Sequence, residues 1–202
     1  MVVLGLDLAG VETRPTGFCI LDEELSAETG ILYGDAEILK VVLEYRPSIV
    51  AIDAPLHLPR GRRSIEDRSG PHLRECDRAL LKAGIRFLPI TLGAMRKLTV
   101  RGMRLKEKLE SLGFEVIEVY PGGAQDVLGI PRGKHSLEGL RKGLARLGLK
   151  GLREGLTVHE LDAATAAYVG YLYLKGEYAA LGDESEGLII MPKSERFSSI
   201  HG

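Results

Sequence analysis

Several common features are missing from this 202-residue sequence. Its 2 cysteines, Cys19 and Cys76, lie far apart and form no CxxC pair, which excludes a disulfide framework and a cysteine-ligated zinc site. No stretch approaches the roughly 20 apolar residues of a membrane span, and the N-terminus has no basic segment before an apolar core. We therefore expect a cytoplasmic protein without a membrane segment or a signal peptide.

Asparagine and tryptophan are also absent, and Gln125 is the single glutamine, whereas lysine, arginine and glutamate are abundant. Few thermolabile amides beside many charges predict a thermophile as the source, which says nothing about function. Residues 5–10 (GLDLAG) match neither GxGxxG nor a P-loop, and the chain contains no GxSxG. Rossmann, P-loop and nucleophile-elbow sites are therefore unsupported.

The net charge of −1 conceals a strong asymmetry along the chain. Residues 1–59 carry 3 basic and 10 acidic side chains, residues 60–153 carry 21 and 10, and residues 154–202 carry 3 and 8. A basic middle between acidic flanks suits an anionic polymer bound next to a carboxylate cluster that a metal ion neutralises. Basic side chains that merely coat exposed helices would give the same counts.

Two aspartates, each at the end of an apolar run, are the most informative feature that is present. Asp7 ends the run VVLGLD, and Asp53 ends the run IVAID just before Ala54 and Pro55. Runs of this kind predict strands that are buried on both faces of a parallel sheet. Since a buried carboxylate is costly unless it is paired or binds a metal, the two aspartates predict a divalent-cation site. Turn or helix N-cap aspartates are the alternative.

The spacing of apolar residues divides the chain into the strands and helices of a mixed α/β domain. We expect strands over residues 2–8, 17–21, 28–33, 49–52, 114–120 and 188–191. We expect helices over residues 35–45, 72–83, 102–112, 137–147 and 159–174. Residues 57–99 have no clean period and predict a helical and loop insertion after the fourth strand, within one domain over residues 1–202.

Two more carboxylates, Glu118 and Asp162, lie where a strand end or a helix start could bring them to the strand-end aspartates. His159 precedes Asp162 by three residues and faces the same side of the last helix, whereas Glu160 should point elsewhere. Carboxylate oxygens suit Mg²⁺ or Mn²⁺, and such ions assist phosphodiester hydrolysis. His159 is a candidate for metal ligation or proton transfer, or else an exposed histidine at a helix N-terminus.

The order of three strands, a helix, a strand and a final aspartate-bearing helix is that of ribonuclease H-like folds. More closely, the chain resembles the predicted ribonuclease H-like nucleases catalogued as domain of unknown function 429. The ordered set of matching stretches, spread over nearly the whole chain, is what carries the resemblance. The stretches are GLDLAG (5–10), AIDAPL (51–56), RECDR (74–78), EVYP (118–121), HELDA (159–163) and GLIIMP (187–192).

This resemblance implies that Mg²⁺ or Mn²⁺ is held by three carboxylates, those of Asp7, Asp53 and Asp162. Glu118 stands in the matching EVYP stretch and is either a further catalytic residue or a residue that orients Arg74 or a neighbouring loop. Arg74 and Asp77 are one helical turn apart, which predicts a structural ion pair. Contact between Arg74 and a substrate phosphate is the alternative.

The leading hypothesis is therefore a divalent-metal-dependent nuclease that hydrolyses nucleic-acid phosphodiester bonds by in-line attack of water. Basic side chains of the middle segment would contact phosphates, which position a strand without reading its sequence. The substrate-binding candidates are Arg60, Arg62, Arg63, Arg68, Arg74, Arg96 and Lys97.

Two other functions stay open at this point. A nucleic-acid or nucleotide binding protein could keep the same fold and side chains without turnover. One lobe of an actin-like or sugar-kinase-like phosphotransferase would share the strand order. That class needs a second lobe, which 202 residues do not hold unless the chain forms a homodimer across the site.

Overall fold

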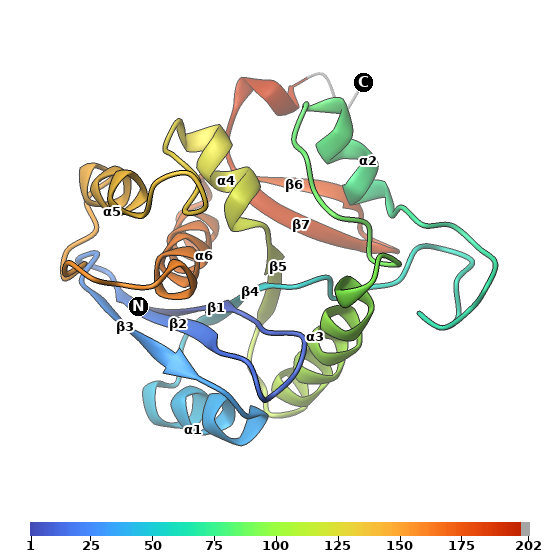
Figure 1. Cartoon of the computed structure of the whole chain (residues 1–202), viewed down its shortest axis with the longest axis horizontal. Helices are drawn as coiled ribbons and strands as arrows, with labels where there is room; N and C mark the ends of the chain where they lie inside the picture. Colours follow the sequence, from blue (N-terminus) through green and yellow to red (C-terminus); the bar gives the residue numbers. More distant parts are fainter. Residues whose placement is uncertain (199–202) are drawn as a thin grey trace.

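A seven-stranded mixed sheet forms the centre of the protein, as a computed structural model that describes residues 1–198 shows (Figure 1). The strands are β1 (Val2–Asp7), β2 (Thr16–Asp22), β3 (Ala27–Leu32), β4 (Ile49–Asp53), β5 (Val116–Val119), β6 (Tyr178–Asp183) and β7 (Gly187–Pro192). Their order is β3-β2-β1-β4-β5-β7-β6, in which β1, β4, β5 and β7 are parallel and β2 and β6 run against their neighbours. This sheet, with the first and fourth strands adjacent, confirms the predicted α/β fold class.

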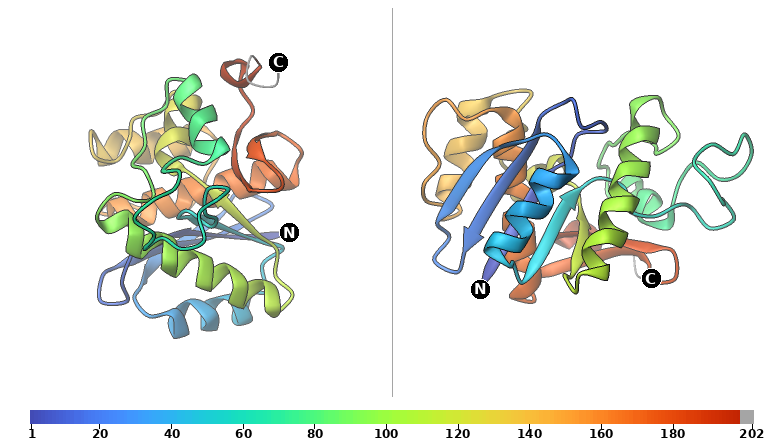
Figure 2. Two further views of the ribbon diagram at one scale, coloured as in Figure 1. Left: turned by 90° about the vertical axis from the view of Figure 1, so that its right-hand side faces the viewer. Right: turned by 90° about the horizontal axis from the view of Figure 1, so that it is seen from below.

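Helices cover both faces of the sheet (Figure 2). They are α1 (Asp35–Tyr45), α2 (Glu75–Lys82), α3 (Ala94–Ser111), α4 (Pro121–Leu128), α5 (Leu137–Arg146), α6 (Val158–Leu174) and the 3₁₀ turn η1 (Glu195–Phe197). On one face, Ile38 of α1 and Leu109 of α3 share a buried cluster with Leu4 of β1. On the other, Ala163 of α6 packs in a second cluster with Val3. Across residues 1–198, none of the helices combines the length and apolar character needed to cross a membrane.

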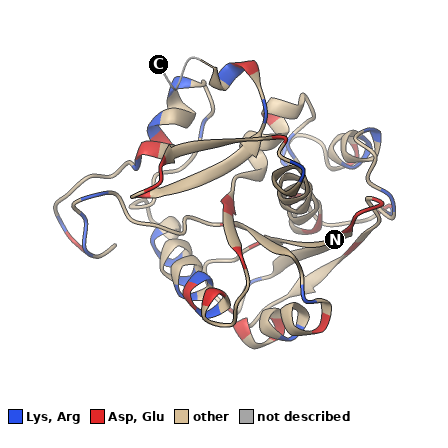
Figure 3. Ribbon diagram, turned by 180° about the vertical axis from the view of Figure 1, so that it is seen from behind, with Lys and Arg blue, Asp and Glu red and all other residues tan. Residues whose placement is uncertain are grey.

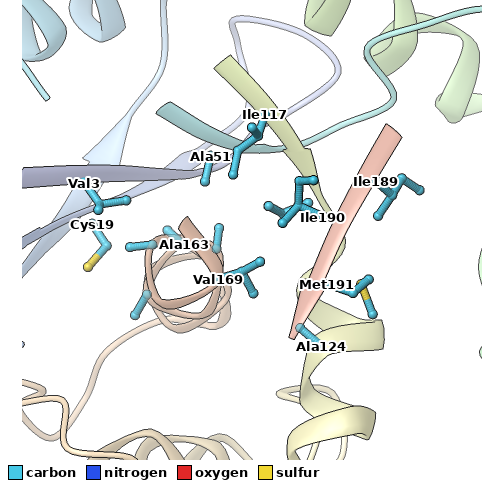
Figure 4. Close-up of a cluster of buried hydrophobic side chains, with 14 of the residues drawn as sticks. Val3, Cys19, Ala51, Ile117, Ala124, Ala163, Val169, Ile189, Ile190 and Met191 are labelled. Atoms are coloured by element: carbon cyan, nitrogen blue, oxygen red, sulfur yellow. The ribbon is translucent and has the colours of Figure 1, made fainter. Parts of the chain in front are cut away.

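The alternation of side chains along β1 and β4 decides which residues meet α6. Successive side chains of a strand point to opposite faces, so Asp7 lies on the same face as Val3 and Gly5, and Asp53 on that of Ala51. Figure 4 shows Val3 and Ala51 in the cluster around α6. Both strand-end carboxylates therefore project from the face that α6 covers.

Glycines on β1 and β2 let α6 approach the sheet closely. A Cβ atom on Gly5 would lie 2.2 Å from the carbonyl oxygen of Ala163 and 2.4 Å from the backbone nitrogen of Ala167. A Cβ atom on Gly17 would lie 2.0 Å from the carbonyl oxygen of His159. These contacts are with helix backbone, which cannot give way as a flexible side chain does. The two glycines thus set how near the first turn of α6 comes to the end of β1.

Gly5→Ala is expected to lower the free energy of unfolding by about 1–3 kcal/mol, as overpacking of a tight core does. Urea denaturation followed by circular dichroism measures the loss. Gly34→Ala is the control, because a Cβ atom there meets only the side-chain oxygen Oε2 of Glu12, at 3.0 Å, and no backbone atom. The control should cost less than about 1 kcal/mol at this helix N-cap. Equal losses in the two variants would contradict the role given to Gly5.

Most predicted elements are present, and helix 35–45 has the bounds that were expected. Helix α3 begins at Ala94 instead of residue 102, directly after Gly93, and α2 begins at Glu75 instead of residue 72. Helix α4 and strand β6 were not predicted. The Pro-Gly-Gly of residues 121–123 suggests a turn, yet proline also favours the first position of a helix. Strand β6 has a weak strand sequence, and its antiparallel pairing with β7 stabilises it.

Between β4 and α3 the chain makes a long excursion whose one helix is α2 (Figure 1). The β6–β7 hairpin fastens this excursion to the body. The carboxylate of Glu186 accepts the backbone N–H groups of Arg60 at 2.6 Å and of Glu75 at 2.5 Å. The guanidinium of Arg60 also pairs with Asp183 at 3.1 Å. These contacts hold both Arg60 and the start of α2, within the predicted insertion, against the β6–β7 hairpin of the sheet.

Candidate active site

Asp7 and Asp53 stand side by side at the carboxyl ends of β1 and β4. The strands are parallel, and Asp7 is the register partner of Asp53. Burial raises the pKa of Asp53 well above its usual value, and the charges of Asp7, Asp162 and Glu118 raise it further. Within residues 1–198, no hydrogen bond to the Asp53 carboxylate opposes these effects. Acidic groups are therefore crowded at this edge of the sheet, and the neutral form of Asp53 is favoured.

His159 reaches the same place from the first turn of α6. Thr157 caps this helix in a capping box with Glu160, whose carboxylate accepts the Thr157 N–H at 2.9 Å, so Glu160 points away from the aspartates as predicted. The Nδ1 atom of His159 lies 2.6 Å from Oδ2 of Asp7. This contact outweighs partial burial and raises the pKa of His159. His159 is thus partly exposed to solvent and is also in contact with Asp7 of the site.

Asp162 follows one turn later and is held by a residue that sequence analysis did not single out as functional. The side-chain nitrogen of Gln125, on α4, donates to Oδ1 of Asp162 at 2.7 Å and to the hydroxyl of Thr165 at 3.1 Å. Burial raises the pKa of Asp162 to about 6, although the Gln125 hydrogen bond acts in the opposite direction. The only signal in the sequence was that Gln125 is its single glutamine, and the helix that carries it was not predicted.

Glu118 is directed away from the aspartates, because its register partner on β4 is Ile52. Its Oε2 atom accepts the backbone N–H of Leu56 and Nη1 of Arg74, both at 2.8 Å, and Nδ1 of His57 lies 3.3 Å away. Burial would raise the pKa of Glu118, but the charge of Arg74 and the contact with His57 lower it. Glu118 therefore orients Arg74 and the loop after β4, and it does not join the aspartates as a catalytic candidate.

Arg74 is buried at the N-terminus of α2 and corrects one substrate-contact prediction. Its Nη2 lies 2.9 Å from Oδ1 of Asp77, and its Nε lies 3.1 Å from Oδ2. With only 2% of the residue exposed, the guanidinium is already bonded to Asp77 and Glu118 and is not free for a phosphate. The predicted structural ion pair between Arg74 and Asp77 is confirmed.

Arg62 corrects a second substrate-contact prediction. The sequence suggested an exposed basic loop, but the Arg62 side chain is buried and donates to backbone carbonyl oxygens across the loop. Its partners are the carbonyls of Pro71 at 2.9 Å, Asp67 at 2.8 Å, Gly70 at 3.3 Å and Ser64 at 3.4 Å. Arg62 therefore fastens the loop internally.

The other basic candidates differ in their surroundings. Arg96 pairs with Glu66 at 2.6 Å, and Arg60 pairs with the β6–β7 hairpin. Figure 3 shows acidic residues among the basic ones along α3, where Lys106 pairs with Glu110. Four candidates are exposed, namely Arg60, Arg63, Arg68 and Lys97, and of these Arg60 is ion-paired.

A cleft beside Asp7 is lined by a basic side chain, that of Arg14, which the sequence analysis did not single out. A cavity of about 390 Å³ is lined by Asp7, His159 and the β1–β2 loop, including Arg14. A second cavity of about 530 Å³ shares Gly10 and Arg14 with the first and extends to Lys97 on α3. Arg14 and Lys97 are exposed, so they are placed to meet an anionic strand that crosses the aspartates.

The donor set fits a hydrated divalent ion at Asp7 and Asp53. Mg²⁺ commonly binds through one or two carboxylates and keeps several waters, and a cation would offset the repulsion that raises the pKa of Asp53. In the described part of the chain, no group of three or more His, Cys, Asp or Glu side chains is arranged to hold a metal. Asp162 is held by Gln125. Its role as a third ligand stays a prediction.

No protein-family model matches the chain, and no curated protein matches it. The membership in the family of domain of unknown function 429 thus stays a prediction. Among solved structures, the structure of this chain is similar to the structure of Thermus thermophilus RuvC. The two are 16% identical in sequence, with 87% of this chain and 97% of that chain covered and a TM-score of 0.49. A likeness this distant says nothing about activity.

Proposed function

We propose that the protein is a divalent-metal-dependent nuclease that hydrolyses phosphodiester bonds in nucleic acid. The pair of Asp7 and Asp53 carries the proposal, because two carboxylates in register at the carboxyl edge of parallel strands lie where α/β proteins bind ligands. The resemblance to predicted ribonuclease H-like nucleases supports the same activity.

Asp7 and Asp53 would hold Mg²⁺ or Mn²⁺, with the carboxylate of Asp162 nearby. When bound, such an ion activates the attacking water and stabilises charge on the phosphate oxygens. Asp53 would lose its proton on binding, because its pKa is raised in the metal-free protein. Gln125 keeps the Asp162 carboxylate in a fixed orientation through the 2.7 Å hydrogen bond.

His159 supplies a proton beside the reacting phosphate. Its contact with Asp7 fixes the imidazole ring and favours the charged form, so the ring can donate a hydrogen bond or a proton to an oxygen of the substrate. Arg14 and Lys97 contact phosphates on the path that leads away from Asp7 along the cleft.

The decisive measurement is cleavage of labelled single-stranded and duplex DNA and RNA with Mg²⁺ or Mn²⁺. Asp7→Asn should reduce the cleavage rate by about 1,000-fold, since losing several kcal/mol of metal-assisted stabilisation costs tenfold per roughly 1.4 kcal/mol. Glu154→Gln, an exposed acid-to-amide change, should cleave at the wild-type rate. Wild-type protein that cleaves none of these substrates, or equal activity of the two variants, would refute the proposal.

A non-catalytic nucleic-acid binding protein on the same fold is the second candidate. The observation that favours it is the absence, in residues 1–198, of three metal-ligating side chains arranged around one point. Filter binding or fluorescence anisotropy in the same experiment separates the two functions. Tight binding without metal-dependent cleavage would support the second candidate.

A further inference from the structure

An apolar pocket adjoins Asp53 on the side away from Asp7. It has a volume of about 200 Å³, and its walls come from α2, the loop after α2, the start of α3 and the end of β5. The side chains that give it its character are Leu80, Phe87, Leu88, Met95 and Leu98. Apolar surface that remains open beside a highly charged cluster calls for a ligand with both an apolar and an anionic part.

The pocket borders the basic cleft. Met95 and Leu98 line both the pocket that contains Asp53 and the cavity that contains Arg14. A chain of phosphates that follows the cleft past the aspartates would therefore pass the mouth of the pocket.

Apart from Asp53, the polar side chains at the pocket wall are already bonded within the protein, so the rest of the wall offers mainly apolar contact. Arg74 and Glu118 are bonded to each other at 2.8 Å, and Arg74 is also bonded to Asp77. Phe87 offers an aromatic ring, and the volume is below the range of about 300–1,000 Å³ that is usual for drug-sized ligands. One flat ring system with a large apolar area matches these walls.

We propose that this pocket receives the base of a nucleotide next to the cleaved phosphodiester, so that the substrate is single-stranded or carries an unpaired base there. The proposal rests on the proposed nuclease function and adds the substrate class. A paired base lies inside the duplex stack and cannot enter, whereas an unpaired base stacks on aromatic side chains in proteins that bind single strands. Leu88 is 59% exposed at the mouth of the pocket, and a bound base would cover it.

Binding of oligonucleotides to the whole protein in EDTA, which prevents metal-dependent cleavage, tests the proposal. An abasic site is moved one position at a time along a single strand. Wild-type affinity should fall about 5- to 100-fold at one position, the range for losing one base-stacking contact. Leu88→Glu should lower the affinity for the intact strand by a similar factor and remove the effect of the abasic site.

Leu92→Glu is the matched control, because Leu92 is 53% exposed on the same loop and does not line the pocket. It should bind like the wild type, and a fully paired duplex should bind less tightly than the single strand. If strands bind but no abasic position matters, or if Leu88→Glu and Leu92→Glu bind alike, the base pocket is refuted and the nuclease proposal stands. If no oligonucleotide binds or is cleaved, both proposals fail.

Discussion

Asp53→Asn is expected to slow metal-dependent cleavage severely and at the same time to make the protein harder to unfold. The two effects have one cause, since the carboxylate that would hold the ion is disfavoured by burial and by the charges of Asp7 and Asp162. The amide keeps the shape of the side chain and removes its charge. We expect a rate loss of about 1,000-fold and a gain in unfolding free energy of about 1 kcal/mol or more.

The pH dependence of stability follows from the raised pKa values. A carboxyl group whose pKa is higher in the folded than in the unfolded protein binds more protons when folded, so stability falls as the pH rises between the two values. For Asp162 this range runs from the unfolded value of about 3.9 to about 6. Asp53 acts in the same direction, as its pKa is also raised. Wild-type protein without divalent ions should therefore be less stable at pH 7.5 than at pH 5.

Urea denaturation of wild type and Asp53→Asn at pH 5 and pH 7.5 measures this effect. The advantage of the variant should be larger at pH 7.5, where more of the wild-type carboxyl groups are charged. Adding Mn²⁺ should raise the melting temperature of the wild type more than that of the variant, because a ligand that binds only the folded state stabilises it. A variant that is less stable than the wild type at pH 7.5, or is equally stabilised by Mn²⁺, would contradict this account.

Arg74→Met is expected to lower the free energy of unfolding by about 3–5 kcal/mol, the usual cost of removing one partner from a buried ion pair. The change leaves the carboxylates of Asp77 and Glu118 buried without their cation. Arg78→Met on the same helix is the control, since Arg78 is exposed and its pair with Glu75 is a surface pair. That control should cost no more than about 1 kcal/mol.

The loss in Arg74→Met should depend on pH. Burial would raise the pKa of Glu118, and it is lowered in the wild type because the charge and hydrogen bond of Arg74 act together with the contact to His57. A carboxylate with a lowered pKa contributes stability above its unfolded value of about 4.3, and this is lost as the pH falls through the folded value. The difference between wild type and variant should therefore shrink in acid. A difference that stays constant from pH 7 to pH 3 would show that packing, and not charge, is responsible.

The sequence alone was sufficient for the elements that contain an uninterrupted hydrophobic pattern. Strand β1 and helix α1 are specified by residues that are close in sequence, namely the apolar run before Asp7 and the helical spacing over residues 35–45. Local periodicity therefore predicts both elements. Helix α4 and strand β6 lack such a pattern. Tyr120 and Pro121 begin α4 where β5 ends, and β6 exists because β7 pairs with it. These elements depend on partners that are distant in sequence.

The basic residues show the same distinction. Arg62, Arg63 and Arg68 lie in one loop, and the sequence does not tell which of them is buried. In the structure, Arg62 is buried among backbone carbonyls and the other two are exposed. Arg74 was recognisable as a partner of Asp77 from helical spacing. Its second bond, to Glu118, joins residues far apart in the chain and could not be predicted with the same certainty.

For the aspartates, the sequence by itself determined that Asp7 and Asp53 end two buried strands, because β-branched runs and the proline that follows are local signals. The resemblance implied that these strands are neighbours, and the tertiary structure decided that they pair in parallel with Asp7 opposite Asp53 and that both carboxylates face α6. It also decided that Glu118 faces the other way, that Gln125 holds Asp162, and that an apolar pocket opens beside Asp53. The physical reason is that strand pairing, and the close packing of α6 on the glycines of the sheet, bring together residues that are far apart in the sequence.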